Sequence, residues 1–427
     1  MFGYQGIREM SELGKAFTKS FSNMTQSNTT LYTYWQGWSE GGREGWSQVQ
    51  RYGDSFDGAI IGAPAFRWSF QQTQLLYSNV VEQTMGYYPS PCELEKIVNE
   101  TIINCDPLDG KTDGVVARTD LCYAQCVEAN NFSAIAGQPY SCPASPAVAG
   151  SPETHAQQGN VTKQAGAVVK KILDGLHDTQ GRRVYFAPTP SAQMTEAQTS
   201  YNATSQQWGF SVISRGGVFV EVEINLLNGS NVPNINGDWI TEGMQRFQGV
   251  LETNWPDLTP YKNADGKVLM FHGESDWGIP TASSVRSWES VRKIMNPGKS
   301  YNDSAGAQNE FFKLFLVSGA THCAANPAQP DGPFPQTNLA VMIDWVENEN
   351  APHTLNATVL QGKNKEQNQQ ICARSGEEMR RIRSAASIRR VLSTGTMTLM
   401  PSTCRYIDWS VYNTFLYTFD GNIDPLP

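Results

Sequence analysis

Long apolar runs are missing from this 427-residue chain. No stretch approaches the roughly 18 consecutive apolar residues of a membrane-spanning helix, so we expect no membrane insertion. The first residues, MFGYQGIREMSELGKAF, also lack the continuous apolar segment of a secretory signal peptide. Basic charge is scarce as well, since 32 Lys and Arg face 41 Asp and Glu for a net charge of −9. A nucleic-acid-binding protein would carry a basic stripe, so nucleic acid is not an expected partner.

Cysteines and glycosylation signals, by contrast, are numerous. The chain has eight cysteines, and four of them lie between residues 105 and 142. Nine N-x-S/T sequons begin at Asn23, Asn28, Asn99, Asn131, Asn160, Asn202, Asn228, Asn302 and Asn356. Together these features favour the oxidising secretory route and an extracellular protein. Because the first residues lack a signal peptide, we expect the natural chain to begin upstream of Met1.

Residues 34–46, YWQGWSEGGREGW, contain a match to G-x-S-x-G centred on Ser39. The match is short, so its surroundings decide whether Ser39 is a nucleophile or a hydroxyl in a glycine turn. Residues 31–37 have the aromatic and β-branched composition of a strand, and a helical pattern follows Gly42. A second apolar strand is predicted at residues 56–65. Strand, sharp turn, helix and strand are the context in which this motif presents a nucleophilic serine.

Alternating strands and helices are predicted in both outer parts of the chain. The further elements are a helix at 5–21, strands at 267–276 and 311–323, and helices at 281–295 and 339–350. This alternation indicates an α/β protein with a mainly parallel sheet, of the α/β-hydrolase fold. The region between about 70 and 255 reads as loop-rich. We therefore predict four parts: a core segment at 1–70, a lid insertion at 71–255, a second core segment at 256–372, and a C-terminal segment at 373–427.

A hydroxyl nucleophile needs a base, and the base needs an orienting carboxylate. Of the five histidines, His322 alone follows a predicted strand closely enough to reach over the edge of the sheet. Asp276 occupies the same kind of position one strand earlier, with Glu274 as its main competitor for the acid role. The order Ser39, Asp276, His322 is the order of α/β-hydrolases.

A second constellation is the acidic stretch CDPLDGKTDGVV at residues 105–116. Asp106, Asp109 and Asp113 offer carboxylates, and Lys111 and Val115 could offer backbone carbonyls, as calcium sites require. The spacing is not that of an EF-hand. From the residues alone, the stretch fits an acidic turn without metal as well as it fits a calcium site. Residues 374–390 are strongly basic and lack an apolar face, which fits either a surface segment or an aberrant stretch of sequence.

Several segments resemble the tannase and feruloyl esterase family, the fungal tannases in particular, over roughly residues 1–372. They are GWSEGGREGWSQVQRYGDSFDGAIIGAPAFRW, CDPLDGKTDGVVARTDLC, HGESDWGIP and GATHCAANPAQPDGPFPQTNLAVMIDWVENENAP. The resemblance implies a secreted serine esterase of phenolic acid esters with Ser39, Asp276 and His322 as its triad. It also implies a structural calcium ion held by Asp106, Asp109, Lys111, Asp113 and Val115. The disulfides it suggests are Cys105–Cys122, Cys126–Cys142 and Cys372–Cys404.

The sequence departs from the family pattern in three places. The family has a cysteine directly before the nucleophile, bridged to the one after the catalytic histidine, whereas this chain has Trp38 and retains Cys323. Cys323 is thereby left for Cys92 or as a free thiol. The family also has a region before the position of Met1 that donates half of the oxyanion hole, so only the backbone N–H of Glu40 is identifiable here. Residues 373–403 match the family poorly.

These observations predict a serine carboxylic ester hydrolase that cleaves phenolic acid esters, galloyl esters above all, through an acyl-enzyme. Two alternatives stay open. One is a feruloyl esterase, and the other is an inactive, calcium-stabilised glycoprotein fragment that only binds such esters. The expected partner is a small phenolic ester, and the oligomeric state is not predicted.

Overall fold

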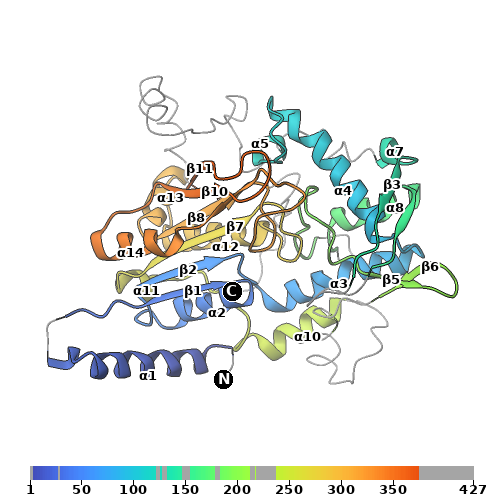
Figure 1. Cartoon of the computed structure of the whole chain (residues 1–427). Coiled ribbons are helices and arrows are strands. Elements are labelled where there is room, and N and C mark those ends of the chain that lie inside the picture. Colours follow the sequence, from blue (N-terminus) through green and yellow to red (C-terminus); the bar gives the residue numbers. More distant parts are fainter. Residues whose placement is uncertain are drawn as a thin grey trace.

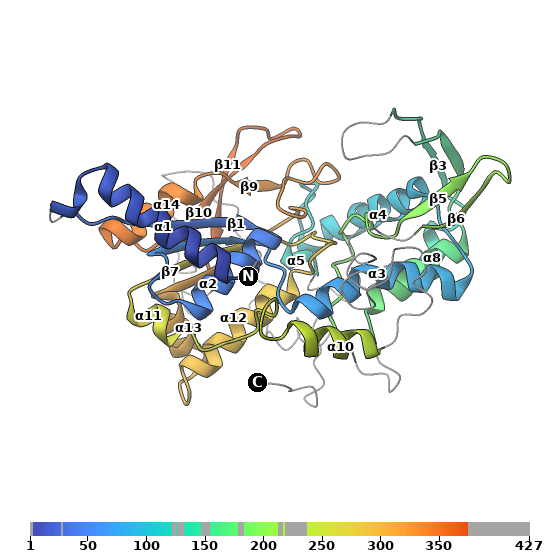
Figure 2. The same ribbon diagram turned by 90° about the horizontal axis from the view of Figure 1, so that it is seen from below.

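The computed structural model describes residues 3–26, 29–121, 126, 132–146, 154–177, 183–211, 217 and 237–374. Within these ranges the chain forms two parts that lie side by side (Figures 1 and 2). One is built on a parallel sheet, and the other is the mainly helical segment between strands β2 and β7. None of the described helices has both the length and the apolar character that a membrane crossing needs.

The central sheet has four parallel strands in the order β1-β2-β7-β8. They are β1 (Tyr34–Trp38), β2 (Gly58–Gly62), β7 (Lys267–Gly273) and β8 (Phe312–Val317). Strands β2 and β8 are buried along their whole length, as expected where both faces of a parallel sheet are covered. The predicted α/β class is therefore confirmed.

Side chains of successive strand residues enter two different hydrophobic cores. Val268 and Met270 of β7 join one core, whereas Leu269 and Phe271 join the other. Because strand side chains alternate in direction, these cores lie on opposite faces of the sheet. Helices on the first face are α2 (Glu40–Arg51), α11 (Thr259–Asn263), α12 (Ala282–Met295) and α13 (Tyr301–Asn309). Helix α14 (Asn338–Asn348) covers the second face with Met342 and Trp345.

Two further elements complete the sheet-containing part. A small antiparallel sheet, ordered β11-β10-β9, is formed by β9 (Pro333–Pro335), β10 (Thr354–Val359) and β11 (Asn368–Cys372). Helix α1 (Gln5–Phe21) spans the predicted range, and a short 3-10 helix η1 (Met24–Gln26) follows it. The apolar stripe of α1 is exposed: the exposed fraction of Leu13 is 73% and that of Phe21 is 81%. It is held instead by polar contacts such as Arg8 Nη1 to Ser55 Oγ at 2.6 Å.

The segment between β2 and β7 is more helical than the sequence analysis predicted. It holds α3 (Trp68–Met85), α4 (Pro91–Cys105), η2 (Asp106–Asp109), α5 (Arg118–Leu121), α7 (Phe132–Ile135), α8 (Lys163–Asp174) and α10 (Gly237–Phe247). Two hairpins pair β3 (Pro139–Cys142) with β4 (Gln157–Asn160) and β5 (Thr199–Asn202) with β6 (Gln207–Phe210). Helix α3 is buried on nearly all sides, so its sequence lacks the one-sided apolar period that marks a surface helix.

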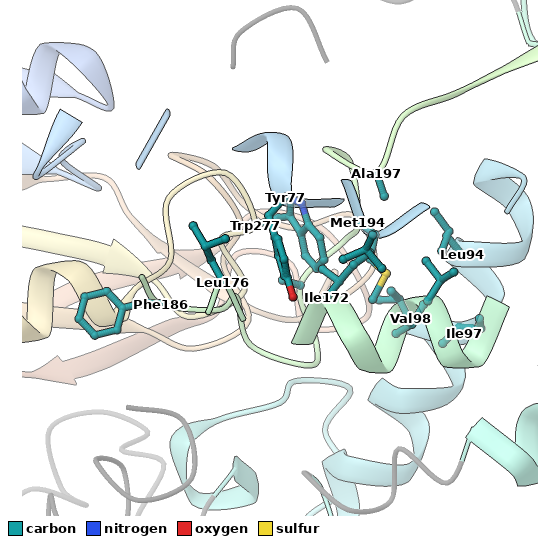
Figure 3. Close-up of a cluster of buried hydrophobic side chains, with 14 of the residues drawn as sticks. Tyr77, Leu94, Ile97, Val98, Ile172, Leu176, Phe186, Met194, Ala197 and Trp277 are labelled. Atoms are coloured by element: carbon teal, nitrogen blue, oxygen red, sulfur yellow. The ribbon is translucent and has the colours of Figure 1, made fainter. Parts of the chain in front are cut away.

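The lid insertion has a hydrophobic core of its own (Figure 3). Side chains of α4 and α8 meet there, among them Leu94, Ile97, Val98 and Ile172. Trp277, which follows β7 in the sheet-containing part, also belongs to this core. The two parts therefore share buried contacts next to residue 276. The predicted domain boundaries remain predictions.

The disulfides differ from those that the resemblance suggested. Cys105 pairs with Cys126, not with Cys122, and Cys142 pairs with Cys92, not with Cys126. Cys92 and Cys105 lie at opposite ends of α4, about 20 Å apart at 1.5 Å per residue, so each bridges to a different neighbour. The predicted Cys372–Cys404 pair involves residue 404, which lies outside the described residues, as do Cys122 and the basic segment 375–390.

Candidate active site

Ser39 sits in the sharp turn between β1 and α2. Its backbone has φ 60° and ψ −119°, a conformation that L residues seldom adopt. A Cβ atom at Gly37 would lie 2.4 Å from the Gly41 carbonyl oxygen, and one at Gly42 would lie 2.7 Å from that of Gly62. Gly37 of the motif and Gly42 just after it are therefore needed for the turn to close, whereas a Cβ atom at Gly41 would meet nothing within 4 Å. The turn lifts Ser39 above the carboxyl end of the sheet.

The imidazole of His322 lies between Ser39 and Asp276. Nε2 of His322 is 2.9 Å from Ser39 Oγ, and Nδ1 is 2.7 Å from Asp276 Oδ2. A carboxylate only accepts hydrogen bonds, so Nδ1 carries the proton and Nε2 can accept the serine hydroxyl. The three side chains that the sequence analysis selected are thus brought together in hydrogen-bonding order, although 283 residues separate Ser39 from His322.

The two partners shift each other's pKa in opposite directions. Burial alone would raise the pKa of Asp276, but the charge of His322 and hydrogen bonds from His272 and His322 lower it to about 2. Burial alone would lower the pKa of His322, but the charge and hydrogen bond of Asp276 raise it above its ordinary value. Asp276 is fully buried, whereas the His322 side chain keeps 26% of its surface exposed. The carboxylate therefore stays ionised, and it favours the imidazolium that proton transfer from Ser39 would form.

Glu274, the competitor for the acid role, is engaged elsewhere. Its carboxylate lies 3.0 Å from Arg118 Nε and accepts a 2.8 Å hydrogen bond from Ser318 Oγ. Arg118 belongs to α5 of the lid insertion, so this buried ion pair joins the lid to the sheet-containing part. Asp276 alone of the two carboxylates contacts His322 in the described hydrogen bonds.

Glu40 is the first residue of α2. The first four N–H groups of a helix have no carbonyl partner within it, and the helix dipole makes this end positive. The Glu40 N–H therefore lies where an oxyanion formed at Ser39 could be stabilised. The Glu40 side chain instead pairs with buried Arg43, whose Nη2 is 2.6 Å from Oε1.

Cys323 and Trp38 flank the triad. Cys323 is an unbridged cysteine, because Cys92 pairs with Cys142. Its Sγ lies 3.8 Å from His322 Nε2, the atom that also contacts Ser39. Trp38 ends β1 opposite Gly62 and packs edge-on against Phe271.

The acidic loop at residues 105–116 uses its carboxylates to bind its own backbone. Asp106 accepts hydrogen bonds from the N–H groups of Asp113 and Gly114, both at 3.1 Å. Asp113 Oδ1 accepts from Val115 N–H at 3.1 Å, and Asp109 Oδ1 from Lys111 N–H at 3.0 Å. No three His, Cys, Asp or Glu side chains are gathered as metal ligands in the described part of the chain.

A fourth carboxylate, Asp120, was missed by the sequence analysis although it lies only seven positions past Asp113. Its Oδ1 accepts a 3.1 Å hydrogen bond from Asp109 N–H. Burial, then the charges of Asp109 and Asp106, raise the pKa of Asp120 to about 7, and burial also raises the pKa of Asp113. These oxygen donors suit calcium in kind, because a cation would relieve their mutual repulsion, but as arranged they do not form a cage.

The parallel sheet with a serine at the turn after β1, and with acid and histidine at later strand ends, defines an α/β-hydrolase. A family model described as tannase and feruloyl esterase matches residues 1–412, beyond residue 372, where the sequence analysis ended the resemblance. A tannase of Aspergillus oryzae is 44% identical over 399 residues, covering 87% of this chain and 67% of that protein. The chain belongs to the tannase and feruloyl esterase family.

Further relatives support the same assignment. A probable feruloyl esterase of Arthroderma benhamiae is 29% identical and covers 84% of this chain and 61% of the relative. The solved tannin acyl hydrolase of Aspergillus niger superposes with a TM-score of 0.79 at 55% identity, over 87% of this chain and 66% of that one. Feruloyl esterase B of A. oryzae, at 23% identity and a TM-score of 0.67, shares the fold. The chain thus spans about two thirds of the length of its relatives.

Proposed function

We propose that this chain is a serine carboxylic ester hydrolase that cleaves phenolic acid esters, with galloyl esters as its preferred substrates. The observation that carries the proposal is the continuous contact from Ser39 Oγ through the His322 ring to Asp276 Oδ2, at 2.9 and 2.7 Å. Transfer of the serine proton to the histidine, which the carboxylate orients, turns a weakly nucleophilic hydroxyl into an effective one.

The reaction follows from these positions. Ser39 Oγ attacks the ester carbonyl carbon while its proton passes to His322 Nε2, and the Glu40 N–H supports the oxygen that becomes negative. When the tetrahedral intermediate collapses, the imidazolium gives that proton to the departing alcohol, and the acyl group remains on Ser39. Water then attacks the acyl-enzyme with His322 as base, which releases the phenolic acid and restores the hydroxyl. Asp276 keeps the imidazole oriented and stays ionised throughout.

Galloyl specificity rests on the relatives. The 44% identical relative is named a tannase and the 55% identical solved structure a tannin acyl hydrolase, whereas the 29% identical relative is named a probable feruloyl esterase. Feruloyl esters are the second candidate substrates. The inactive fragment is the alternative from another class, motivated by Trp38 beside the nucleophile and by the single identified oxyanion donor.

Secretion and glycosylation belong to the same proposal. Asn23, Asn160 and Asn202 each begin a sequon and are exposed, so an attached glycan meets no packed side chain. The two disulfides of the lid insertion suit an oxidising compartment.

Calcium binding in the acidic loop is also proposed, through Asp106, Asp109 and Asp113 with the carbonyls of Lys111 and Val115. Its support is the oxygen donor set and the mutual repulsion of the carboxylates. Added Ca²⁺ is expected to raise the Tm relative to EGTA, and Mg²⁺ to raise it less. Asp113→Asn should remove the calcium-dependent rise. An unchanged Tm of the native chain in Ca²⁺ and EGTA would contradict the proposal.

The test of the activity is hydrolysis of methyl gallate and methyl ferulate by the purified 427-residue chain and by Ser39→Ala. Faster turnover of methyl gallate, lost in the variant, is the expected result. Faster turnover of methyl ferulate would favour the feruloyl esterase. Folded protein that neither turns over an ester nor reacts with a fluorophosphonate would support the inactive fragment.

A further inference from the structure

A second histidine, His272, contacts the carboxylate that orients His322. It lies near the end of β7, is fully buried, and places Nε2 3.2 Å from Asp276 Oδ2. The same Nε2 lies 2.9 Å from the carbonyl oxygen of Ile279, and Nδ1 lies 2.8 Å from Ser284 Oγ on α12. His272 lies within the predicted strand at 267–276 and not past its end as His322 does, so the sequence criterion for the base does not select it.

These contacts determine which ring nitrogen carries hydrogen. The Ile279 carbonyl can only accept a hydrogen bond, so Nε2 of His272 must donate. The ionised Asp276 carboxylate, 3.2 Å from the same Nε2, also only accepts, so the two acceptors share one hydrogen. Ser284 can then donate its hydroxyl hydrogen to Nδ1. Nε2 of His272 therefore carries a hydrogen, and contacts at both ring nitrogens hold the ring in place.

Asp276 consequently receives three donors. Oδ2 is shared by His322 Nδ1 and His272 Nε2, while Oδ1 accepts the N–H of Ile279 at 2.9 Å. The 276–279 turn is thus pinned twice by His272, once through the carboxylate and once through the Ile279 carbonyl. The donors from His272 and Ile279 lie outside the triad. They hold the Asp276 carboxylate in the orientation in which it also accepts from His322. Catalytic contacts of this kind tolerate little displacement, because an error of about 1 Å can lower the rate about 10²-fold.

We propose that His272 is a positioning residue of the esterase, fixing Asp276 and the 276–279 turn so that Asp276 meets His322 in the reactive orientation. The inference rests on the proposed function. His272 does not touch the reacting atoms, and it acts through Asp276. Its removal is expected to lower kcat while KM for the ester stays near the native value, because substrate does not contact this buried ring.

The test compares His272→Phe with His272→Gln. Phenylalanine fills the space without a donor, whereas the glutamine amide can place an N–H near the position of Nε2. Methyl gallate turnover is measured per active site, with sites counted by fluorophosphonate labelling. His272→Phe is expected to lose about 10²-fold in kcat, and His272→Gln to regain much of it.

Val285→Ala is the matched control for lost packing. Val285 neighbours Ser284 on α12 and is buried in the core under the sheet. The Val285→Ala substitution is expected to lower the Tm without lowering kcat per labelled site. If His272→Phe lowers the Tm but keeps native kcat per site, or if His272→Gln is as slow as His272→Phe, the role is only structural and the inference is overturned.

The ring tautomer gives a readout that needs no activity. In ¹⁵N NMR spectra of the native chain, His272 is expected to carry its hydrogen on Nε2 and His322 on Nδ1. A hydrogen on Nδ1 alone of His272 would overturn the inference even if esters are cleaved. An active native enzyme with an unaffected His272→Phe would overturn it while the proposed function stands. A native chain without turnover or labelling would instead count against the proposed function.

Discussion

The indole of Trp38 packs edge-on against the ring of Phe271, with centroids 6.2 Å apart and ring planes inclined by 74°. Phe271 in turn meets Phe334 of β9 edge-on at 6.1 Å. Trp38 also lies over Gly62, where a Cβ atom would be 2.3 Å from its Cδ1. The residue before the nucleophile is therefore fixed by a line of aromatic contacts running from β1 through β7 to β9, at the position where the family is expected to have a bridged cysteine.

Loss of the Trp38 ring is expected to affect stability and turnover together. Trp38→Ala removes the contacts with Phe271, and large-to-small changes at packed aromatic sites cost up to about 3–5 kcal/mol. Because Trp38 is only partly buried, we expect about half of that in the free energy of unfolding, with a lower kcat from a looser Ser39. Trp38→Phe, which keeps an edge-on ring, is the control. Chemical denaturation and methyl gallate assays measure both effects, and a Trp38→Ala chain with native stability would refute the role of this packing.

Alkylation of Cys323 is expected to inactivate the esterase. Its Sγ lies 3.8 Å from His322 Nε2, so an added acetamide group would crowd the nitrogen that must accept the Ser39 proton. Treatment with iodoacetamide should abolish turnover, and methyl gallate should slow the loss. Cys323→Ser should keep turnover and resist the reagent. Equal inactivation of the serine variant would show that another group is the target.

The acid limb of the pH–rate profile is expected to lie above the ordinary histidine pKa of about 6.5. His322 acts as base only when neutral, and Asp276 raises its pKa, so the active fraction grows as pH rises through that raised value. Asp276→Asn should move the limb to lower pH and lower kcat by about 10⁴-fold, as expected when the orienting carboxylate is lost. Profiles of kcat/KM for both chains test this, and an unmoved limb would contradict it.

Glu82 is expected to make the fold less stable at alkaline pH. Burial raises the pKa of this carboxyl to about 8, although Asn79 Nδ2 donates to it at 3.1 Å. The folded state therefore prefers the protonated form, and stability is fully present below the unfolded pKa of about 4.3 and lost as pH rises through about 8. The Glu82→Gln chain, whose side chain stays neutral, should be more stable than the native chain above pH 8. Thermal unfolding at pH 5 and pH 9 checks this, and parallel pH dependence of both chains would rule it out.

The triad could be predicted because its signals are local. A glycine-lined turn after a strand and polar residues just past two later strands place Ser39, Asp276 and His322 at one edge of a parallel sheet. Helices α1, α2, α12 and α14 follow one-sided apolar patterns and lie close to the predicted ranges.

The features that were missed depend on tertiary packing. The role of His272 appears only when the turn after β7 folds back onto the strand. A histidine in an apolar run does not by itself indicate a contact with the catalytic carboxylate. Its spacing of four residues before Asp276 is the one signal that could have been used. Disulfide pairing likewise follows the packing of α4 against its neighbours, because sequence spacing does not distinguish Cys122 from Cys126 as the partner of Cys105.

The separation of 283 residues between Ser39 and His322 bears on when the molecule becomes active. During synthesis the serine leaves the ribosome first, and its base follows only after the whole lid insertion has been made. Contacts between such distant residues form late, because the chain entropy lost on closing a long loop must be overcome before the contacts can stabilise the fold. Until β8 joins the sheet, the nascent chain has no general base beside its serine. Ester hydrolysis by this protein therefore reports that β8 and the loop carrying His322 have joined the sheet, and a chain interrupted anywhere before residue 322 has no triad.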